Sequence, residues 1–212
     1  MKLNGLLIGA LVLISFGAKA QLITYTGLSN KYVYKINLVK NSDTTGYPRD
    51  SQDNLYIDSK INLYIFNKSK RLIQKISFTA GILFDSAYKD NKNSRSYITG
   101  KNKNADASDY DFGDLIIADL NFDGKEDVVV KRDSGGNGGP FYNFYIQGNN
   151  GRFYKENYLT TYVGSFPAYI EPKKKTITTQ IHANVSQEGK KTFKYDIKTH
   201  KWHLIKWVMV DY

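Results

Sequence analysis

Between residues 115 and 130 the chain reads LIIADLNFDGKEDVVV. Residues 119–127 have the pattern D-x-N-x-D-G-x-x-D, which matches the front of an EF-hand-type calcium loop. Oxygen-bearing side chains fall at alternate positions, and the glycine after the third of them permits a sharp turn. We therefore expect a calcium site. Its ligands would be the side chains of Asp119, Asn121, Asp123 and Asp127 and the backbone carbonyl of Lys125.

The flanks of this loop read as strands, because apolar runs precede it at 115–118 and follow it at 128–130. An EF-hand loop lies between helices and carries a bidentate glutamate at its twelfth position. The twelfth position here is Val130, so that ligand is missing. With fewer protein ligands we expect weak binding, with a Kd of about 10⁻⁴–10⁻³ M. Calcium would then stabilise the fold, because its ligands converge only in the native state. The alternative is an Asx-rich turn without a metal.

The composition and the patterning indicate an all-β fold. The chain contains 17 Tyr and 11 Phe, residues that favour strands. Apolar residues alternate with polar ones over residues 31–39, 60–66 and 192–197, as in half-buried strands. No stretch after residue 20 has the period of a long amphipathic helix.

A weak internal repeat combines two strands around a short polar turn, at residues 63–73, 144–154 and 194–204. The turns carry the Asn, Gly and Ser that are typical of hairpins. Repeated hairpins favour an incomplete or small β-propeller-like array of antiparallel hairpins, with the EF-hand-like calcium loop between strands. A barrel or sandwich built as a meander of hairpins is the alternative.

Two long polar stretches, 41–58 and about 85–111, are expected to be loops. The second leads into an acidic zone, and we single out Asp106, Asp109, Asp111 and Asp114 as candidates for binding a basic partner. An insertion without a binding role is the alternative. The glycine-rich segment 135–139 is followed by a strand pattern, so it is neither a Walker loop nor a dinucleotide fingerprint. Its glycines indicate positive-φ turns or close backbone approach, and a ligand-facing loop is the other interpretation.

The first 20 residues are expected to be a signal peptide. Lys2 is followed by a short apolar stretch and by Ala18-Lys19-Ala20, an A-x-A cleavage site. We expect a single exported domain over 21–212, periplasmic or extracellular, with no transmembrane helix after cleavage. A retained membrane anchor is the alternative. The absence of cysteine excludes disulfides and a cysteine-linked lipid anchor.

The net charge of +10 falls to +8 when Lys2 and Lys19 are removed, and it is unevenly distributed. Residues 106–127 are strongly acidic, whereas residues 173–206 are rich in lysine. A basic surface is attracted to anionic headgroups or wall polymers, but we favour the simpler interpretation of ordinary solvated lysines on strand faces. We do not expect nucleic acid as a partner, because no binding module is recognisable.

Candidate catalytic groups are few. The histidines His182, His200 and His203 do not have the spacing of a metal pair, and no Gly-x-Ser-x-Gly motif or cysteine nucleophile is present. We therefore expect no catalytic residues. A carboxylate-dependent hydrolase that uses the acidic zone remains an alternative.

Residues 113–212 resemble a family of exported bacterial calcium-binding, propeller-like proteins that share the calcium loop of FG-GAP/VCBS-type repeats. The resemblance rests on the calcium loop, the glycine-rich turn, the strand pattern at 141–146 and the hairpin patterns after residue 174. It implies an incomplete β-propeller with calcium held by the ligands named above. Some members inhibit c-type lysozymes. Such lysozymes are basic and would be repelled by a +8 protein, and the acidic zone 106–114 is the surface that could offset this.

The sequence thus predicts an exported, calcium-binding, non-catalytic binding protein, with lysozyme inhibition as the concrete form of that function. A carbohydrate- or cell-wall-binding module is the first alternative, because exposed aromatic rings around a pocket would stack on sugars. The hydrolase is the second.

Overall fold

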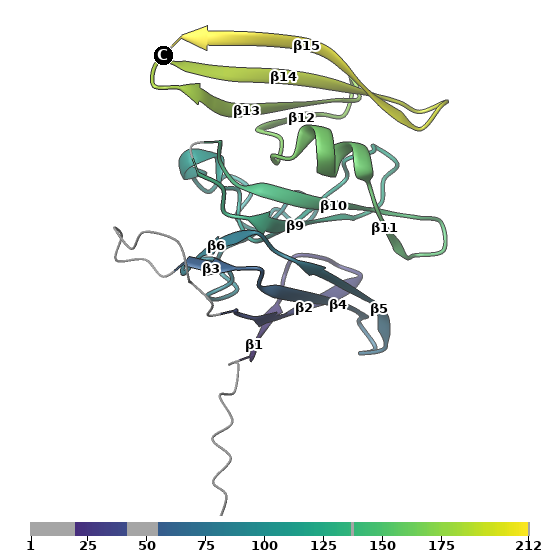
Figure 1. The fold of residues 1–212 in the computed structure, drawn as a ribbon. Helices are drawn as coiled ribbons and strands as arrows, with labels where there is room; N and C mark the ends of the chain where they lie inside the picture. The colour runs from purple at the N-terminus through teal and green to yellow at the C-terminus, as the bar shows by residue number, and fades with distance from the viewer. Residues whose placement is uncertain (1–19, 42–54, 137, 212) are drawn as a thin grey trace, which may run out of the picture.

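The computed structural model describes residues 20–41, 55–136 and 138–211. It is almost entirely β, which confirms the predicted all-β class. Three sheets built from hairpins are stacked as layers (Figure 1), and over the described residues they do not close into a barrel or a ring. A two-stranded ribbon of β3 (Leu55–Ile57) and β6 (Ile82–Phe84) adds to them. The predicted loop 41–58 lies largely outside the described residues.

The first sheet has the order β1-β2-β4-β5, and all its strands are antiparallel. Its strands are β1 (Ala20–Tyr25), β2 (Tyr32–Val39), β4 (Lys60–Asn67) and β5 (Leu72–Thr79). The alternation predicted at 31–39 appears in β2, where every second residue from Tyr34 to Leu38 is fully buried. The first predicted hairpin is confirmed by the pairing of β4 with β5.

The middle sheet has the order β11-β10-β9-β8-β7. Its strands are β7 (Ser94–Ser96), β8 (Leu115–Ala118), β9 (Asp127–Asp133), β10 (Phe141–Gln147) and β11 (Phe153–Lys155). Strand β7 pairs with β8 in parallel. The 3₁₀-helical turn η1 (Ser108–Tyr110) lies between these two strands in the chain. The stretch 85–111, expected to be a long loop, therefore contains a short strand. Because that strand is three residues long and reads Ser-Arg-Ser, no alternating apolar pattern marks it.

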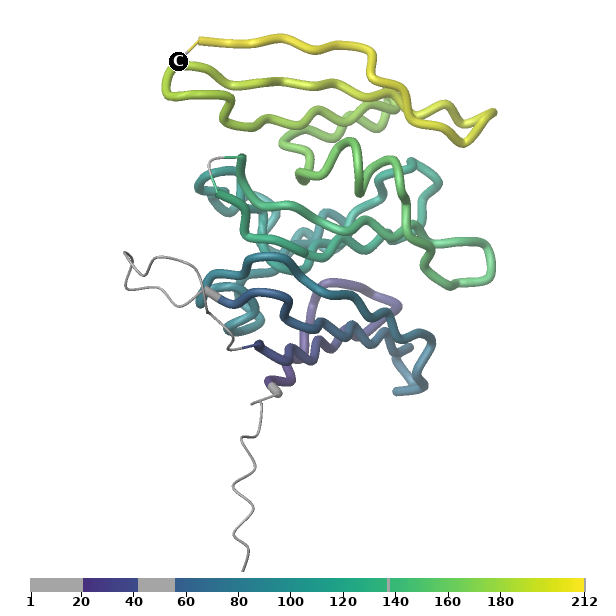
Figure 2. Tube along the Cα trace, viewed as in Figure 1, coloured from purple at the N-terminus to yellow at the C-terminus, as the bar shows by residue number. Residues whose placement is uncertain are grey.

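The third sheet has the order β12-β13-β14-β15 and forms the upper layer in Figures 1 and 2. Its strands are β12 (Tyr169–Glu171), β13 (Thr176–Asn184), β14 (Gln187–Asp196) and β15 (Lys201–Asp211). The π-helical turn η2 (Leu159–Val163) leads into it from the middle sheet. No helix in the described residues is long and apolar enough to cross a bilayer.

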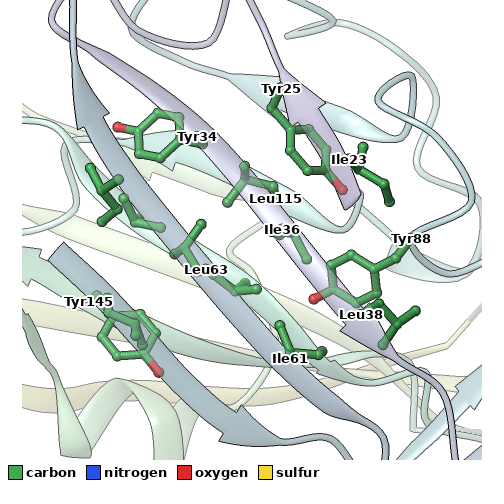
Figure 3. Packing of buried hydrophobic residues seen from close by; sticks show 14 of the residues in the cluster. Ile23, Tyr25, Tyr34, Ile36, Leu38, Ile61, Leu63, Tyr88, Leu115 and Tyr145 are labelled. Atoms are coloured by element: carbon green, nitrogen blue, oxygen red, sulfur yellow. The ribbon is translucent and has the colours of Figure 1, made fainter. Parts of the chain in front are cut away.

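The middle sheet is covered on both faces, and this explains its uninterrupted apolar runs. Along β8, Leu115 and Ile117 join the core shared with the first sheet, whereas Ile116 and Ala118 join the core shared with the third. Figure 3 shows Leu115 and Tyr145 packed with Ile36 and Leu63 of the first sheet. A strand buried on both faces reads as a continuous apolar run instead of an alternating one.

Candidate functional site

The candidate calcium loop, residues 119–127, connects β8 to β9 in the middle sheet, between strands as predicted. The carboxylate of Asp119 accepts hydrogen bonds from the backbone N–H groups of Asp123, at 3.0 Å, and Gly124, at 2.9 Å. Gly124 has a φ of +80°, a conformation that side chains with a Cβ rarely adopt. The loop therefore folds back over its own first ligand.

Asp127 is the most deeply buried member of the expected ligand set, with no exposed surface. Its carboxylate oxygens accept hydrogen bonds from the N–H groups of Leu120, at 2.8 Å, and Gln147, at 3.0 Å. Burial and, to a smaller extent, the negative charges of Asp119 and Asp123 raise the pKa of Asp127 to about 7, although these hydrogen bonds act to lower it. Three carboxylates therefore repel one another here, which is the electrostatic setting that a cation relieves.

Asp123 is oriented toward a lysine. Its carboxylate lies 2.9 Å from Nζ of Lys125, which also donates to the side chain of Asn149 at 2.9 Å. Within the described residues, no three acidic or histidine side chains are grouped closely enough to hold a metal ion. The donor set itself fits calcium, since Asp119, Asn121, Asp123 and Asp127 offer only oxygens apart from the amide NH₂. Asp123 would have to exchange the ammonium of Lys125 for the ion.

The loop contacts all three sheets. Glu126, which is 4% exposed, accepts a hydrogen bond from Ser29 in the turn between β1 and β2. Asp127 accepts a hydrogen bond from the N–H of Gln147 on β10, as described above. Toward the third sheet, the ring of Phe122 packs against that of Trp202 at a tilt of 54°, with centroids 6.2 Å apart. A change in the stability of this loop would therefore be felt by the whole fold.

The four candidate partner-binding aspartates separate into two groups. Asp114 is fully buried and forms an ion pair with Lys131, whose Nζ lies 2.9 Å from Asp114 and 2.7 Å from Asp111. Burial acts to lower the pKa of Lys131, but Asp114 and Asp111 outweigh it and raise that pKa. Asp114 is thus placed inside the fold and away from any partner. Asp106, Asp109 and Asp111 retain exposed surface.

These three aspartates line one cleft of about 1090 Å³. Across the cleft lie the glycine-rich loop, represented by Gly136, Gly138 and Gly139, and the turn between β13 and β14. A second depression of about 530 Å³ shares Asp106 and Asp111 with it. The structure therefore brings together two segments that the sequence singled out separately. Asn137 lies outside the described residues.

His182 of β13 also reaches this cleft, and the sequence analysis did not connect it with the acidic zone. Its Nε2 lies 3.5 Å from the carboxylate of Asp109, and its ring packs against Tyr110 with centroids 5.2 Å apart. The hydroxyl of Tyr110 donates to Glu188 on the neighbouring strand β14. These contacts join the acidic segment to the third sheet. Because they connect residues more than 70 positions apart, no local spacing signals them.

The glycine-rich loop is tightly folded at its start. Gly135 has a φ of +67°, and a Cβ at this position would lie 1.9 Å from the carbonyl oxygen of Gly139. Both a positive φ and a close backbone approach therefore require glycine here, as the sequence indicated.

No family model matches the chain, and no curated protein matches it. Among solved structures, the chain is similar to a Xanthomonas protein described as related to a type IV secretion system. The sequence identity is 19%, the TM-score is 0.54, and the match covers 90% of this chain and 82% of the other. At this identity the likeness concerns the fold alone.

Proposed function

We propose that this chain is an exported calcium-binding protein without catalytic activity, which acts by binding another protein. The observation that supports the proposal is the loop 119–127, which carries four oxygen-bearing side chains at calcium-loop spacing and contacts all three sheets. In this proposal Asp119, Asn121, Asp123, Asp127 and the Lys125 carbonyl hold the calcium. The three sheets would be blades of an incomplete β-propeller, in keeping with the resemblance to proteins with FG-GAP/VCBS-type loops.

Calcium would act structurally, by stabilising the loop that joins the sheets. For a Kd of about 10⁻⁴–10⁻³ M, calcium at about 10 mM adds roughly 1.4–2.7 kcal/mol to the free energy of unfolding. The test is a thermal melt of residues 21–212 in calcium, in magnesium and in chelator. A rise in Tm with calcium alone supports the site. An unchanged Tm in all three conditions would contradict it.

The proposed partner surface is the cleft lined by Asp106, Asp109 and Asp111. Because the protein as a whole is basic, this acidic cleft is where a basic partner would meet attraction instead of repulsion. A c-type lysozyme is the concrete candidate, given the resemblance described above. Binding is measured by calorimetry with lysozyme at low and at moderate salt, together with inhibition of lysozyme activity.

A matched pair of variants tests the cleft. Asp109 and Asp58 are both exposed and both have positive φ, at 51° and 53°, which asparagine tolerates as well as aspartate. Asp109→Asn removes one charge from the cleft, whereas Asp58→Asn removes one from the turn between β3 and β4. We expect weaker lysozyme binding only in the first variant. Equal binding by both variants and the parent chain would show that the cleft is not the binding surface.

The alternative of a carbohydrate- or wall-binding module has less support from the positions of the aromatic rings. Phe84, which is 39% exposed, lines the larger cleft, but it is the one exposed ring there among the described residues. The most exposed rings line neither cavity, and they belong to Tyr154, Tyr162, Tyr169 and Trp207. Titration with peptidoglycan fragments separates this alternative from protein binding. The carboxylate-dependent hydrolase would be revealed by turnover of the same fragments.

A further inference from the structure

Strand β15 forms one edge of the third sheet and is the uppermost strand in Figure 1. It pairs with β14 on one side, and in the described part of the chain no strand pairs with its other side. The open side therefore presents a row of N–H and C=O groups without strand partners. Such a row is a template for pairing with another strand.

The side chains of this edge are unusually apolar for an exposed strand. Ile205, Trp207 and Met209 are 54%, 62% and 47% exposed, and Lys206 is the one charged residue between positions 204 and 210. Natural edges are normally protected by several charges, by proline or by bulges. Here a bulge falls at Ile205, which has no partner in β14, and the strand then runs regularly from Lys206 to Asp211.

We propose that β15 pairs with β15 of a second copy of this chain, antiparallel, with Val208 on the two-fold axis. Residues directly opposite each other share a face of the sheet, and a two-fold axis perpendicular to the sheet preserves that face. Faces alternate along a regular strand, so the numbers of two opposed residues differ by an even number. The residue midway between them therefore lies on the two-fold axis. With Val208 there, Trp207 lies opposite Met209 of the second copy and Lys206 lies opposite Val210.

The neighbouring registers are less favourable. An axis through Trp207 would place the bulged Ile205 opposite Met209 and would bring the two Lys206 side chains into diagonal contact, at about 7–8 Å. An axis through Met209 would place Asp211 opposite the apolar ring of Trp207. The register centred on Val208 separates the lysines and pairs a thioether with an aromatic ring. Its five central residues, 206–210, lie in the regular part of the strand, and the bulged Ile205 meets Asp211 only at the end of the pairing.

The resulting dimer would join two four-stranded sheets into one continuous sheet of eight strands. The side chain of Lys191, whose Nζ lies 4.8 Å from the ring centroid of Trp207, would remain beside this ring and contribute to the rim of the interface. The dimer does not depend on calcium binding or on the acidic cleft, because no residue of either lies on β15.

Cysteine cross-linking tests the register directly, because the chain has no cysteine of its own. In the proposed dimer Val208→Cys places two thiols opposite each other, with Cβ atoms about 4.5–5.5 Å apart. Residues 21–212 carrying this change should therefore form a disulfide-linked dimer under mild oxidation. Lys206→Cys and Val210→Cys should each form no disulfide-linked dimer alone and should cross-link to each other when mixed. Efficient self-linking of Lys206→Cys, or no linking by any variant, would overturn the proposal.

Sedimentation equilibrium tests the dimer without a covalent bond. The parent chain should show a mass that rises toward twice the monomer as its concentration increases. Val208→Lys would place two like charges opposite each other on the axis and should keep the chain monomeric. Val185→Lys, at the fully exposed turn between β13 and β14, is the matched control and should dimerise like the parent. A parent chain that stays monomeric, or equal dimerisation by both variants, would refute the pairing.

Discussion

Two aspartate-rich segments lie near each other in the sequence, and each is paired with one lysine, but they are neutralised differently. In residues 106–114, the buried Lys131 holds Asp114 and Asp111 at 2.9 and 2.7 Å. In residues 119–127, the partly exposed Lys125 holds Asp123 at 2.9 Å. A buried charge pair cannot be given up without a large penalty, whereas a surface pair is weak. The first segment therefore has a permanent internal cation, and the second has a replaceable one.

The largest effect should come from removing the permanent cation. Lys131→Met leaves the buried carboxylate of Asp114 without its cation, although the N–H of Tyr88 still donates to it, and this loss costs about 3–5 kcal/mol. We expect a large drop in the free energy of unfolding, measured by chemical denaturation, that calcium does not restore. The double variant Lys131→Met/Asp114→Asn should recover part of it, because no uncompensated charge then remains. A loss below about 1 kcal/mol for the single variant would show that the pair resembles a surface pair.

The next effect is a pH dependence of the calcium-free protein. The pKa of Asp127 is about 7 in the folded chain and about 3.9 when unfolded, so the folded state binds this proton more tightly. Stability should therefore fall as the pH rises from about 4 to 7, by up to about 4 kcal/mol, and level off above that range. In the proposed site calcium would bind the ionised carboxylate, so its stabilising effect should be larger at pH 8 than at pH 5.

Denaturation in calcium-depleted and calcium-containing buffers across this pH range measures the effect. Asp127→Asn removes the titrating group, so this variant should lose the pH dependence of the calcium-free protein. An equal calcium effect at pH 5 and pH 8 would show that Asp127 does not take part in binding.

Loss of a single calcium ligand should have an intermediate effect. Asp123→Ala should abolish the calcium-dependent gain of roughly 1.4–2.7 kcal/mol while changing the calcium-free Tm little. Asp90→Ala is the matched control, because Asp90 accepts the N–H of Lys92 in the same way that Asp123 accepts the N–H of Lys125. The control should keep its full calcium response. Equal destabilisation of Asp123→Ala with and without calcium would contradict a metal role.

The sequence was sufficient for features whose signal is local. Alternation located β2, β4 and β14, and the turn residues located three hairpins. The loop 119–127 was found between two strands because its ligands and its glycine are close in the chain. By contrast, the short strand β7 carries no apolar pattern that could mark it. It is recognised only by its pairing with β8, which depends on tertiary contacts.

The parts that could not be predicted depend on distant residues. Asp114 looked like its three acidic neighbours, and only the position of Lys131 on the adjacent strand places it in the interior. Likewise, the contacts of the calcium loop with Ser29 and Trp202 span 97 and 80 positions. Composition and spacing report the type of a side chain, whereas its role here is set by the stacking of three sheets.

The smallest effect would come from removing the replaceable cation. Lys125→Met preserves the backbone carbonyl expected to bind calcium and removes the ammonium that competes for Asp123. A surface pair is worth about 0.2–1 kcal/mol, so calcium affinity should rise by roughly 1.5- to 5-fold, measured by calorimetry. Lys103→Met changes an exposed lysine just before the acidic segment and controls for the loss of one positive charge. If both variants gain affinity equally, the effect is one of net charge, and Lys125 is not the group that calcium replaces.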